Sequence, residues 1–259
     1  MTRVDPVAAA GFSSAADVYE RARPSYPADA IAWLVERTGL GPGRTVVDLA
    51  AGTGKLTRLL AGTGARVIAV EPIEEMRALI TGAETLDGTA EELPLPDGSA
   101  DVVTVAQALH WFDIERALAE IHRVLRPGGR LVLVWNMRDT ADPVQRGVEE
   151  LLAPLRGVVA ARQGRWREPV ARSELFGDAE VREFENVQLM TAEGLRDRVA
   201  STSFVAAMPA DEREALLARV TELVVDVEEP FGFPYTTEVH VFPRSRDRAL
   251  ERSATSDEG

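Results

Sequence analysis

A glycine-rich turn between an apolar stretch and a helical pattern is the part of this sequence best suited to bind a ligand. Residues 46–49 (VVDL) are followed by the turn AAGTG at 50–54 and by a helical pattern from Lys55. Glycines in such a turn let the backbone approach a ligand closely, and the helix that follows presents free N–H groups. Asp48 adds a carboxylate at the end of the apolar stretch. These features predict a nucleotide or nucleoside site.

Three classes of ligand use such a turn, and individual positions disfavour two of them. A phosphate-binding P-loop needs a glycine five positions before the Gly-Lys pair and a Ser or Thr after it, but Leu49 and Leu56 stand there. A dinucleotide fingerprint counted from Gly52 needs Gly or Ala where Thr57 stands. The favoured interpretation is a nucleoside bound without phosphates, with Asp48 organising the turn around a cation-bearing ligand.

Glu71 places a second carboxylate at the end of the next apolar stretch, residues 67–70, and lies 23 residues after Asp48. A carboxylate at this place can accept from both hydroxyls of a ribose. The alternative is that Glu71 caps a helix beginning at Pro72. The glycine turn upstream favours the ribose.

Polar and aromatic side chains that follow later apolar stretches are further candidates, because ligands of open α/β sheets bind at the carboxyl ends of strands. Glu91 is a candidate acceptor for an exocyclic amine, and its alternative is a solvated loop acid. His110 is the candidate catalytic residue as a general base, and its alternative is a hydrogen bond that shapes the mouth of the pocket. Trp111 either stacks on a flat substrate or packs in the core.

Asn136 and Arg138 follow the apolar stretch at 131–135 and are the other candidate substrate residues. A guanidinium can bind a carboxylate through two parallel hydrogen bonds. The alternative for Arg138 is an ion pair with Asp139 or Asp142.

Short apolar stretches alternate with helical patterns through the first half of the chain. Stretches that are apolar on both faces are typical of parallel strands covered by helices. The expected strands are 46–49, 67–70, 102–105 and 131–135, and the expected helices are 27–38, 55–61, 72–81 and 113–125. The segment RPGG at 126–129 is expected to end the last of these helices. The alternation predicts an α/β fold of the doubly wound, Rossmann-like type with right-handed crossovers.

The second half of the chain is less regular. Its expected helices are 143–159, 192–201 and 210–225, and its expected strands are 181–189 and 236–242. We expect this strand pair to be antiparallel at the edge of an otherwise mostly parallel sheet. The basic run at 162–172 is interpreted as a solvated face or a loop. The segment before Tyr26 is expected to form a mobile, helical N-terminal cap, and the charged ending after residue 244 a disordered tail.

Composition and charge exclude several classes of function. The 259 residues include 29 basic and 42 acidic side chains, and the net charge of −13 argues against a nucleic-acid partner. The absence of cysteine excludes disulfides, thiolate nucleophiles and Cys-ligated metals, and no metal site is expected. No apolar run approaches the about 18 residues of a membrane span, and the N-terminus lacks a signal-peptide pattern. We therefore expect a globular protein of the cytoplasm without a membrane partner.

The order and spacing of these motifs resemble those of the class I S-adenosylmethionine-dependent methyltransferases. The matching motifs lie at 48–54, 71, 88–91 and 125–129. They fall within about residues 44–136 and are similar to the small-molecule branch related to ubiquinone-biosynthesis and trans-aconitate methyltransferases. Residues 19–27 and 110–112 resemble a narrower subgroup of that branch.

The resemblance implies S-adenosyl-L-methionine as the cofactor, bound by Tyr19, Arg23, Asp48, Ala50, Gly52, Gly54, Glu71, Met76, Thr89, Ala90, Glu91 and Gln107. The backbone of the glycine turn would hold the methionyl part, and the backbone carbonyl of Gln107 would face its ammonium group. Glu71 would bind the ribose, and Met76 would lie against the adenine. Tyr19 and Arg23 would close over the site, with Arg23 as a partner of the cofactor carboxylate.

The adenine loop departs from the family pattern at one position. Ala90 and Glu91 would meet the edge of the adenine. Thr89 stands where many members have Asp, so the usual carboxylate for the adenine amine is missing. Glu91 or the backbone must then replace it.

The resemblance implies direct in-line transfer of a methyl group to a small-molecule acceptor. One alternative is a protein that binds S-adenosylmethionine without transferring the methyl group, as a sensor or a non-methylating enzyme. Another is an NAD-dependent oxidoreductase, which Thr57 disfavours.

A monomer or a homodimer is expected. The implied organisation is a cap at 1–43, a methyltransferase domain at 44–244 (core motifs at 44–140, substrate-side and edge elements at 141–244) and a tail at 245–259.

Overall fold

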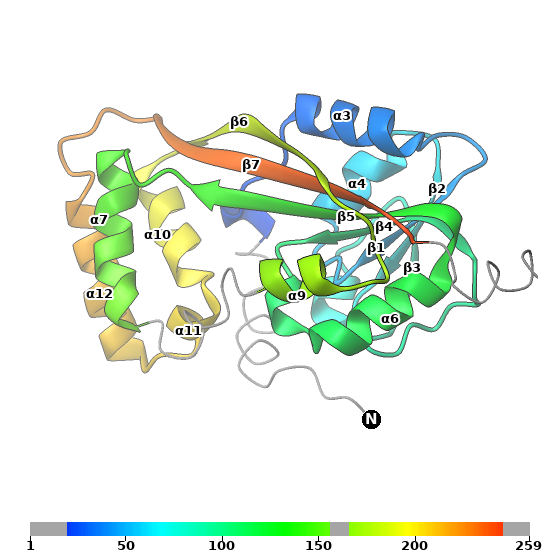
Figure 1. Cartoon of the computed structure of the whole chain (residues 1–259). Helices are drawn as coiled ribbons and strands as arrows, with labels where there is room; N and C mark the ends of the chain where they lie inside the picture. The colour runs from blue at the N-terminus through cyan, green and yellow to red at the C-terminus, as the bar shows by residue number, and fades with distance from the viewer. Residues whose placement is uncertain (1–19, 156–165, 246–259) are drawn as a thin grey trace, which may run out of the picture.

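One seven-stranded sheet with helices on both faces forms the body of the protein (Figure 1). The computed structural model describes residues 20–155 and 166–245. The strands are β1 (Thr45–Leu49), β2 (Arg66–Val70), β3 (Glu84–Leu86), β4 (Ala100–Ala106), β5 (Leu125–Arg138), β6 (Glu180–Met190) and β7 (Phe231–Pro243). Their order across the sheet is β3-β2-β1-β4-β5-β7-β6.

The strand directions confirm the fold expected from the sequence. The strands β1 to β5 pair in parallel, whereas β7 is antiparallel to both β5 and β6. The sheet is therefore a Rossmann-like, doubly wound, mostly parallel sheet with an antiparallel pair at its edge.

Helices cover the two faces of the parallel part of the sheet. They are α3 (Ala28–Thr38), α4 (Lys55–Ala61), α5 (Glu74–Arg77) and α6 (Ile114–Val124). One core cluster packs Ile121 of α6 against one face, and a second packs Leu34 of α3 against the other. Neighbouring residues of β1 point to opposite faces, so that Val47 joins the first cluster and Val46 the second. This two-sided burial explains why the strands are continuously apolar.

The helix α5 is shorter than the helix expected at 72–81. After Arg77 the chain continues in tight turns, because Leu79 N donates to Met76 O (3.0 Å) and Ile80 N to Arg77 O (3.1 Å). The side chain of Ile80 then packs against Gly54, where an added Cβ would lie 3.3 Å from Ile80 Cγ1. The chain thus leaves the helix early and closes against the glycine turn.

A group of helices packs at the far ends of the long strands β5, β6 and β7 (Figure 1). They are α7 (Pro143–Leu152), α10 (Ala192–Ala200), α11 (Ser203–Ala206) and α12 (Ala210–Glu222), and the short η2 (Ala153–Leu155) follows α7. Their buried side chains form a third cluster with Phe233 and Tyr235 of β7. The helix expected at 143–159 therefore ends at Leu152, and residues 156–165 lie outside the described ranges.

The basic run interpreted as a solvated face or a loop contains a helix, α9 (Arg167–Arg172). Trp166 and Val170 are buried in the cluster on the α6 side, and the Arg167 guanidinium lies 5.0 Å from the centre of the Trp166 ring. Trp166 and Val170 are four positions apart, as on one face of a helix. The many arginines of the run dominate its sequence pattern, so this spacing was not used in the interpretation.

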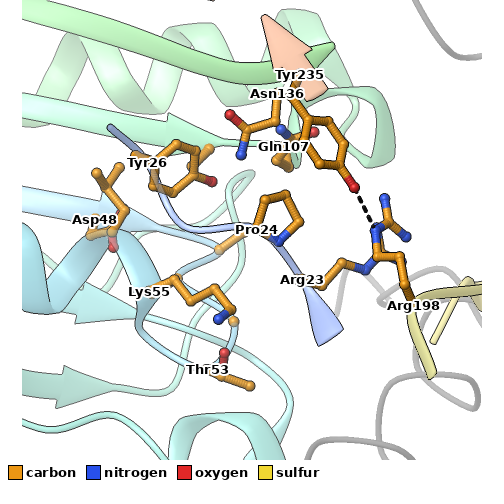
Figure 2. Close-up of a pocket in the computed structure, with 15 residues that line it drawn as sticks. Arg23, Pro24, Tyr26, Asp48, Thr53, Lys55, Gln107, Asn136, Arg198 and Tyr235 are labelled. Atoms are coloured by element: carbon orange, nitrogen blue, oxygen red, sulfur yellow. Dashed lines mark hydrogen bonds between the residues drawn. The ribbon is translucent and has the colours of Figure 1, made fainter. Parts of the chain in front are cut away.

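The two ends of the described chain are both tied to the sheet. Residues 20–22 are helical, and residues 23–26 follow the edge where the parallel strands end (Figure 2). At the other end, Arg244 N donates to Gly129 O and Ser245 N to Leu175 O, both at 2.9 Å. Residues 246–259 of the expected tail lie outside the described ranges, and the expected domain boundaries stay predictions. No helix within 20–155 or 166–245 has the length and apolar character needed to cross a membrane.

The segment expected to end the helix at 126–129 belongs to β5, which begins at Leu125. The register between β4 and β5 shifts between Ala100 and Val102, so the four residues form an irregular start of the strand. Asp101 stabilises this irregularity. Its carboxylate accepts from Thr45 N (2.8 Å), Arg44 Nη1 (2.9 Å) and Arg126 Nη1 (2.8 Å).

We expect Asp101→Ala to lower the free energy of unfolding by about 1–3 kcal/mol, because the buried Thr45 N–H would lose its acceptor. Urea denaturation followed by circular dichroism measures the change. Asp97→Ala is the matched control, since this exposed carboxylate pairs with Arg123 alone among the residues that the structure describes and should change the stability by less than about 1 kcal/mol. Equal losses in the two variants would contradict a special role of Asp101.

Candidate functional site

A pocket lies where β1 and β4 end, beside residues 23–26 (Figure 2). Among the residues predicted from sequence, it is lined by Arg23, Asp48, Ala50, Gly52, Gln107 and Asn136. It is also lined by residues to which sequence reasoning assigned no role, namely Pro24, Tyr26, Ala51, Thr53, Lys55, Leu56, Ala106, Arg198 and Tyr235. The fold thus brings segments from both ends of the chain to the carboxyl ends of the parallel strands.

The backbone of the pocket is strained at two neighbouring strand ends. Ala50 (φ 53°) and Gln107 (φ 59°) are the non-glycine residues with positive φ in the described ranges, and both line the pocket. Such conformations cost about 1–3 kcal/mol and persist only where the surrounding structure imposes them. Here the N–H groups of Ala51 and Gln107 are held by Val70 O (3.2 Å) and Val134 O (3.0 Å). Strain of this kind clusters at binding sites.

Asp48 is buried (1% exposed) and joins three elements of the site. Its carboxylate accepts from the hydroxyl of Thr57 on α4 (2.6 Å) and from that of Thr104 on β4 (2.8 Å). Burial raises the pKa of Asp48 to about 6, although the two hydroxyls oppose the rise. Asp48 therefore fixes the start of α4 against β4 at the end of β1.

Glu71 is also buried (4% exposed), and its carboxylate holds the glycine turn from the other side. Its oxygens accept from Gly52 N (2.8 Å) and Ile73 N (2.9 Å). Burial raises the pKa of Glu71, and the charge of Asp48 raises it further. Glu71 thus links Gly52 to Ile73, the residue before α5, without capping that helix, and each oxygen keeps capacity for a second hydrogen bond. Its binding to a ribose stays a prediction.

Glu20 ties the N-terminal segment to the glycine turn. Thr53 Oγ1 donates to Glu20 Oε2 (2.5 Å), Arg58 pairs with Glu20 Oε1, and Lys55 Nζ lies 3.8 Å from the same oxygen. Burial lowers the pKa of Lys55, and the charge of Glu20 opposes this change. Glu20 belongs to the N-terminal motif noticed in the sequence, but no role was assigned to it. Tyr19 lies outside the described residues.

Two arginines from distant parts of the chain meet at the pocket. Arg23 Nη2 donates to Ser201 O (2.9 Å), and Arg198 Nε donates to the hydroxyl of Tyr235 (3.1 Å; Figure 2). Sequence reasoning missed Arg198 because it lies in the amphipathic helix α10, far in sequence from every motif.

The residues predicted to surround the adenine do not line this pocket. Met76 and Ala90 are buried. Thr89 forms a bridge with Glu92, and Glu91 Oε1 accepts from Asp113 N (2.9 Å) at the start of α6. Gly54, another predicted residue, is the left-handed N-cap of α4. Their contacts with an adenine stay predictions.

The predicted catalytic and substrate residues separate into three places. His110 lies on the short helix η1 (Leu109–Trp111), with its ring 4.7 Å from that of Trp111 and 5.6 Å from that of Trp135. Neither His110 nor Trp111 lines the pocket. Arg138 also lies outside the lining and pairs with Glu149 (3.1 Å), a residue not considered from the sequence. Asn136 lines the pocket and donates to Ser25 O (3.2 Å).

We expect Asp48→Asn to remove a pH-dependent part of the stability. With the pKa of Asp48 at about 6 in the folded state against 3.8 for the ordinary group, the folded protein keeps a proton that the unfolded chain releases. The wild type therefore loses stability as pH rises through this window, by about 3 kcal/mol at most.

Urea denaturation between about pH 4.5 and 8 measures this effect. The free energy of unfolding of the Asn variant, relative to wild type, should increase with pH and level off above about pH 7. The exposed-site variant Asp97→Asn serves as control, and a difference between Asp48→Asn and wild type that does not vary with pH would contradict the assignment.

Comparison with known proteins places these elements in one family. A family model described as Methyltransferase domain matches residues 47–133. An uncharacterized methyltransferase of Mycobacterium tuberculosis is 45% identical over 218 residues, which cover 82% of this chain and 85% of that protein. The ubiquinone/menaquinone biosynthesis C-methyltransferase UbiE of Rubrivivax gelatinosus is 44% identical over 96 residues, 35% of this chain and 38% of that protein.

A solved structure agrees with the fold. Phosphoethanolamine N-methyltransferase 2 of Haemonchus contortus, in complex with S-adenosyl-L-methionine, matches with a TM-score of 0.55 and 18% identity. The match covers 90% of this chain and 57% of that one. The region matched by the family model contains the glycine turn, both buried carboxylates and the strained strand ends. The chain belongs to the methyltransferase family, as the motifs of its sequence indicated.

Proposed function

We propose that this methyltransferase moves the methyl group of S-adenosyl-L-methionine directly onto a small molecule bound in the pocket beside β1 and β4. The observation that supports this most strongly is the glycine turn together with two buried carboxylates, Asp48 and Glu71, that hold the elements around it. Asp48 accepts from the hydroxyl of Thr57 and so fixes the helix α4 that follows the turn, and Glu71 accepts from Gly52 N (2.8 Å). The turn thereby keeps an open, strained geometry at the wall of the pocket.

The residues present fit the cofactor. An added Cβ at Gly52 would meet nothing within 4 Å, so the pocket side of the turn is open to a ligand. Glu71 offers acceptor capacity for ribose hydroxyls. Arg23 supplies a cation for the methionyl carboxylate, and the carbonyl of Gln107, in its strained conformation, is the acceptor for the ammonium group.

Catalysis by this chain consists mainly of positioning. When bound, S-adenosyl-L-methionine supplies an electrophilic methyl group, and the electrons of the broken C–S bond leave on a neutral thioether. The protein has to hold the acceptor in line with that bond, and such orientation is worth up to about 7–11 kcal/mol. Glu20 ties the start of the segment 20–26 to Thr53 of the glycine turn, which keeps this segment beside the site.

A small acceptor suits the position of the pocket and the charge of the chain. The pocket lies between the strand ends, residues 23–26 and the helix α10. A net charge of −13 opposes binding of a nucleic acid.

A general base is needed only for an acceptor of high pKa, and His110 stays the candidate for that case. Location in the cytoplasm and a monomeric or homodimeric state also stay predictions.

We expect Glu71→Ala to weaken the binding of S-adenosyl-L-methionine and of S-adenosylhomocysteine about 10- to 150-fold, the equivalent of about 1.5–3 kcal/mol for a charged hydrogen-bonding partner. Isothermal titration calorimetry measures the affinity. Glu71→Gln keeps one acceptor and should lose less, whereas Glu84→Ala, which removes an exposed partner of Arg66, should bind as wild type does. An unchanged affinity in Glu71→Ala would refute the ribose assignment.

Single-turnover reactions with a labelled methyl group test the transfer itself. Incubation of the wild type with labelled S-adenosyl-L-methionine and a panel of small metabolites should give a labelled product with at least one acceptor. Enzyme with Gly52→Val is the control, because a branched side chain at a φ of 59° would both strain the turn and fill its open side. Cofactor binding without a labelled product from any acceptor would instead indicate a sensor.

A further inference from the structure

Arg198 is a buried cation without a balancing charge in the described structure. The residue is 7% exposed, and its Nε donates to the hydroxyl of Tyr235 (3.1 Å). Its Nη1 is buried and has no hydrogen-bond partner. Within residues 20–155 and 166–245, no carboxylate oxygen lies within 4.0 Å of its guanidinium. Because an arginine stays charged in proteins, such burial costs several kcal/mol unless a partner arrives.

The position of Arg198 shows where that partner would come from. Arg198 lines the pocket with Tyr235, and Figure 2 shows both at one end, away from Asp48. Arg23 approaches the same end, since it donates to Ser201 O while Ser201 Oγ donates to Arg198 O (2.9 Å each). Tyr235 thus holds the guanidinium, and Ser201 links the backbone of Arg198 to Arg23, beside the pocket in which an acceptor would lie.

We propose that Arg198 binds a carboxylate of the methyl acceptor, an inference that rests on the proposed function of the same pocket. A planar guanidinium matches a carboxylate through two parallel hydrogen bonds, and Nη1 has that capacity unused. In a chain of net charge −13, an anionic acceptor needs such a local cation to enter.

The acceptor is a better partner for Arg198 than the cofactor is. The glycine turn and both buried carboxylates lie within residues 47–133, the region shared with the family, whereas Arg198 and Tyr235 lie outside it. A carboxylate held by a guanidinium has its lone pairs engaged and is a poor nucleophile. Arg198 therefore anchors one carboxylate, and the methyl group goes to a different atom of the same acceptor.

Binding of simple acids to the full chain loaded with S-adenosylhomocysteine tests the proposal. The probes are benzoate and succinate, each with its neutral amide, and ligand-observed NMR titration measures their affinities. For the wild type we expect at least one acid to bind at least tenfold more tightly than its amide. Arg198→Gln should abolish that preference, and Arg198→Lys should retain part of it. The affinity for S-adenosylhomocysteine should stay within twofold of wild type in both variants.

Arg196→Gln is the matched control, because Arg196 lies on the same helix but pairs with Glu214 and does not line the pocket. It should keep the wild-type preference for acids. If the wild type binds neither acid more tightly than the corresponding amide, this measurement alone overturns the proposal. The proposal is also overturned if a folded Arg198→Gln variant keeps the wild-type preference for the acid, or if this variant loses tenfold in its affinity for S-adenosylhomocysteine. Failure of the wild type to bind S-adenosylhomocysteine would instead refute the proposed function.

Discussion

The buried carboxylate of Asp48 is the interaction on which the rest of the site depends. It lies at the end of β1 and accepts from hydroxyls of α4 and β4, so a single charged group joins three elements. Its burial is unfavourable for the ionised form, as the raised pKa shows. The gain is a fixed glycine turn, because α4 cannot move relative to β4 without breaking these bonds. The strained conformations of Ala50 and Gln107 lie on either side of this junction.

The two halves of the chain contribute different chemistry to the same pocket. The parallel half supplies carboxylates and strained backbone, which suit a ligand bearing donor groups. Residues 23–26 and the helix α10 supply arginines. The long antiparallel strands make this possible, since residues 130–138 of β5 pair with residues 235–243 of β7, and both strands continue beyond the parallel sheet to the helices α7, α10 and α12 (Figure 1). A cation on α10 thereby reaches a pocket built on β1 and β4.

Local patterns predicted the elements well where the sequence period matched the packing. The strand cores, α4, α6 and the antiparallel pair were expected within a few residues, because two-sided burial leaves only apolar residues in the strands. Prediction failed where a distant contact decided the outcome. The helix expected up to residue 81 stops at Arg77, where Ile80 turns onto Gly54. The helix before residues 126–129 ends as expected, but the sequence did not indicate that these residues already belong to β5. Arg138 pairs with Glu149 on α7, a partner that no local pattern indicated, and its role toward a substrate stays a prediction.

The sequence by itself determined the family, the sheet and the two carboxylates of the glycine turn, because short-range spacing along a strand, turn and helix carries that information. Only the tertiary structure decided which charges reach the pocket. Arg198 and Tyr235 are separated from the motifs by long stretches of chain, and their side chains reach the pocket only when β7 and α10 pack beside residues 23–26. Glu20 lies within the N-terminal motif, but its contacts with Thr53 and Arg58 arise only in the folded chain. Whether a guanidinium is paired or left unpaired depends on the three-dimensional positions of all neighbouring carboxylates, which no local pattern encodes.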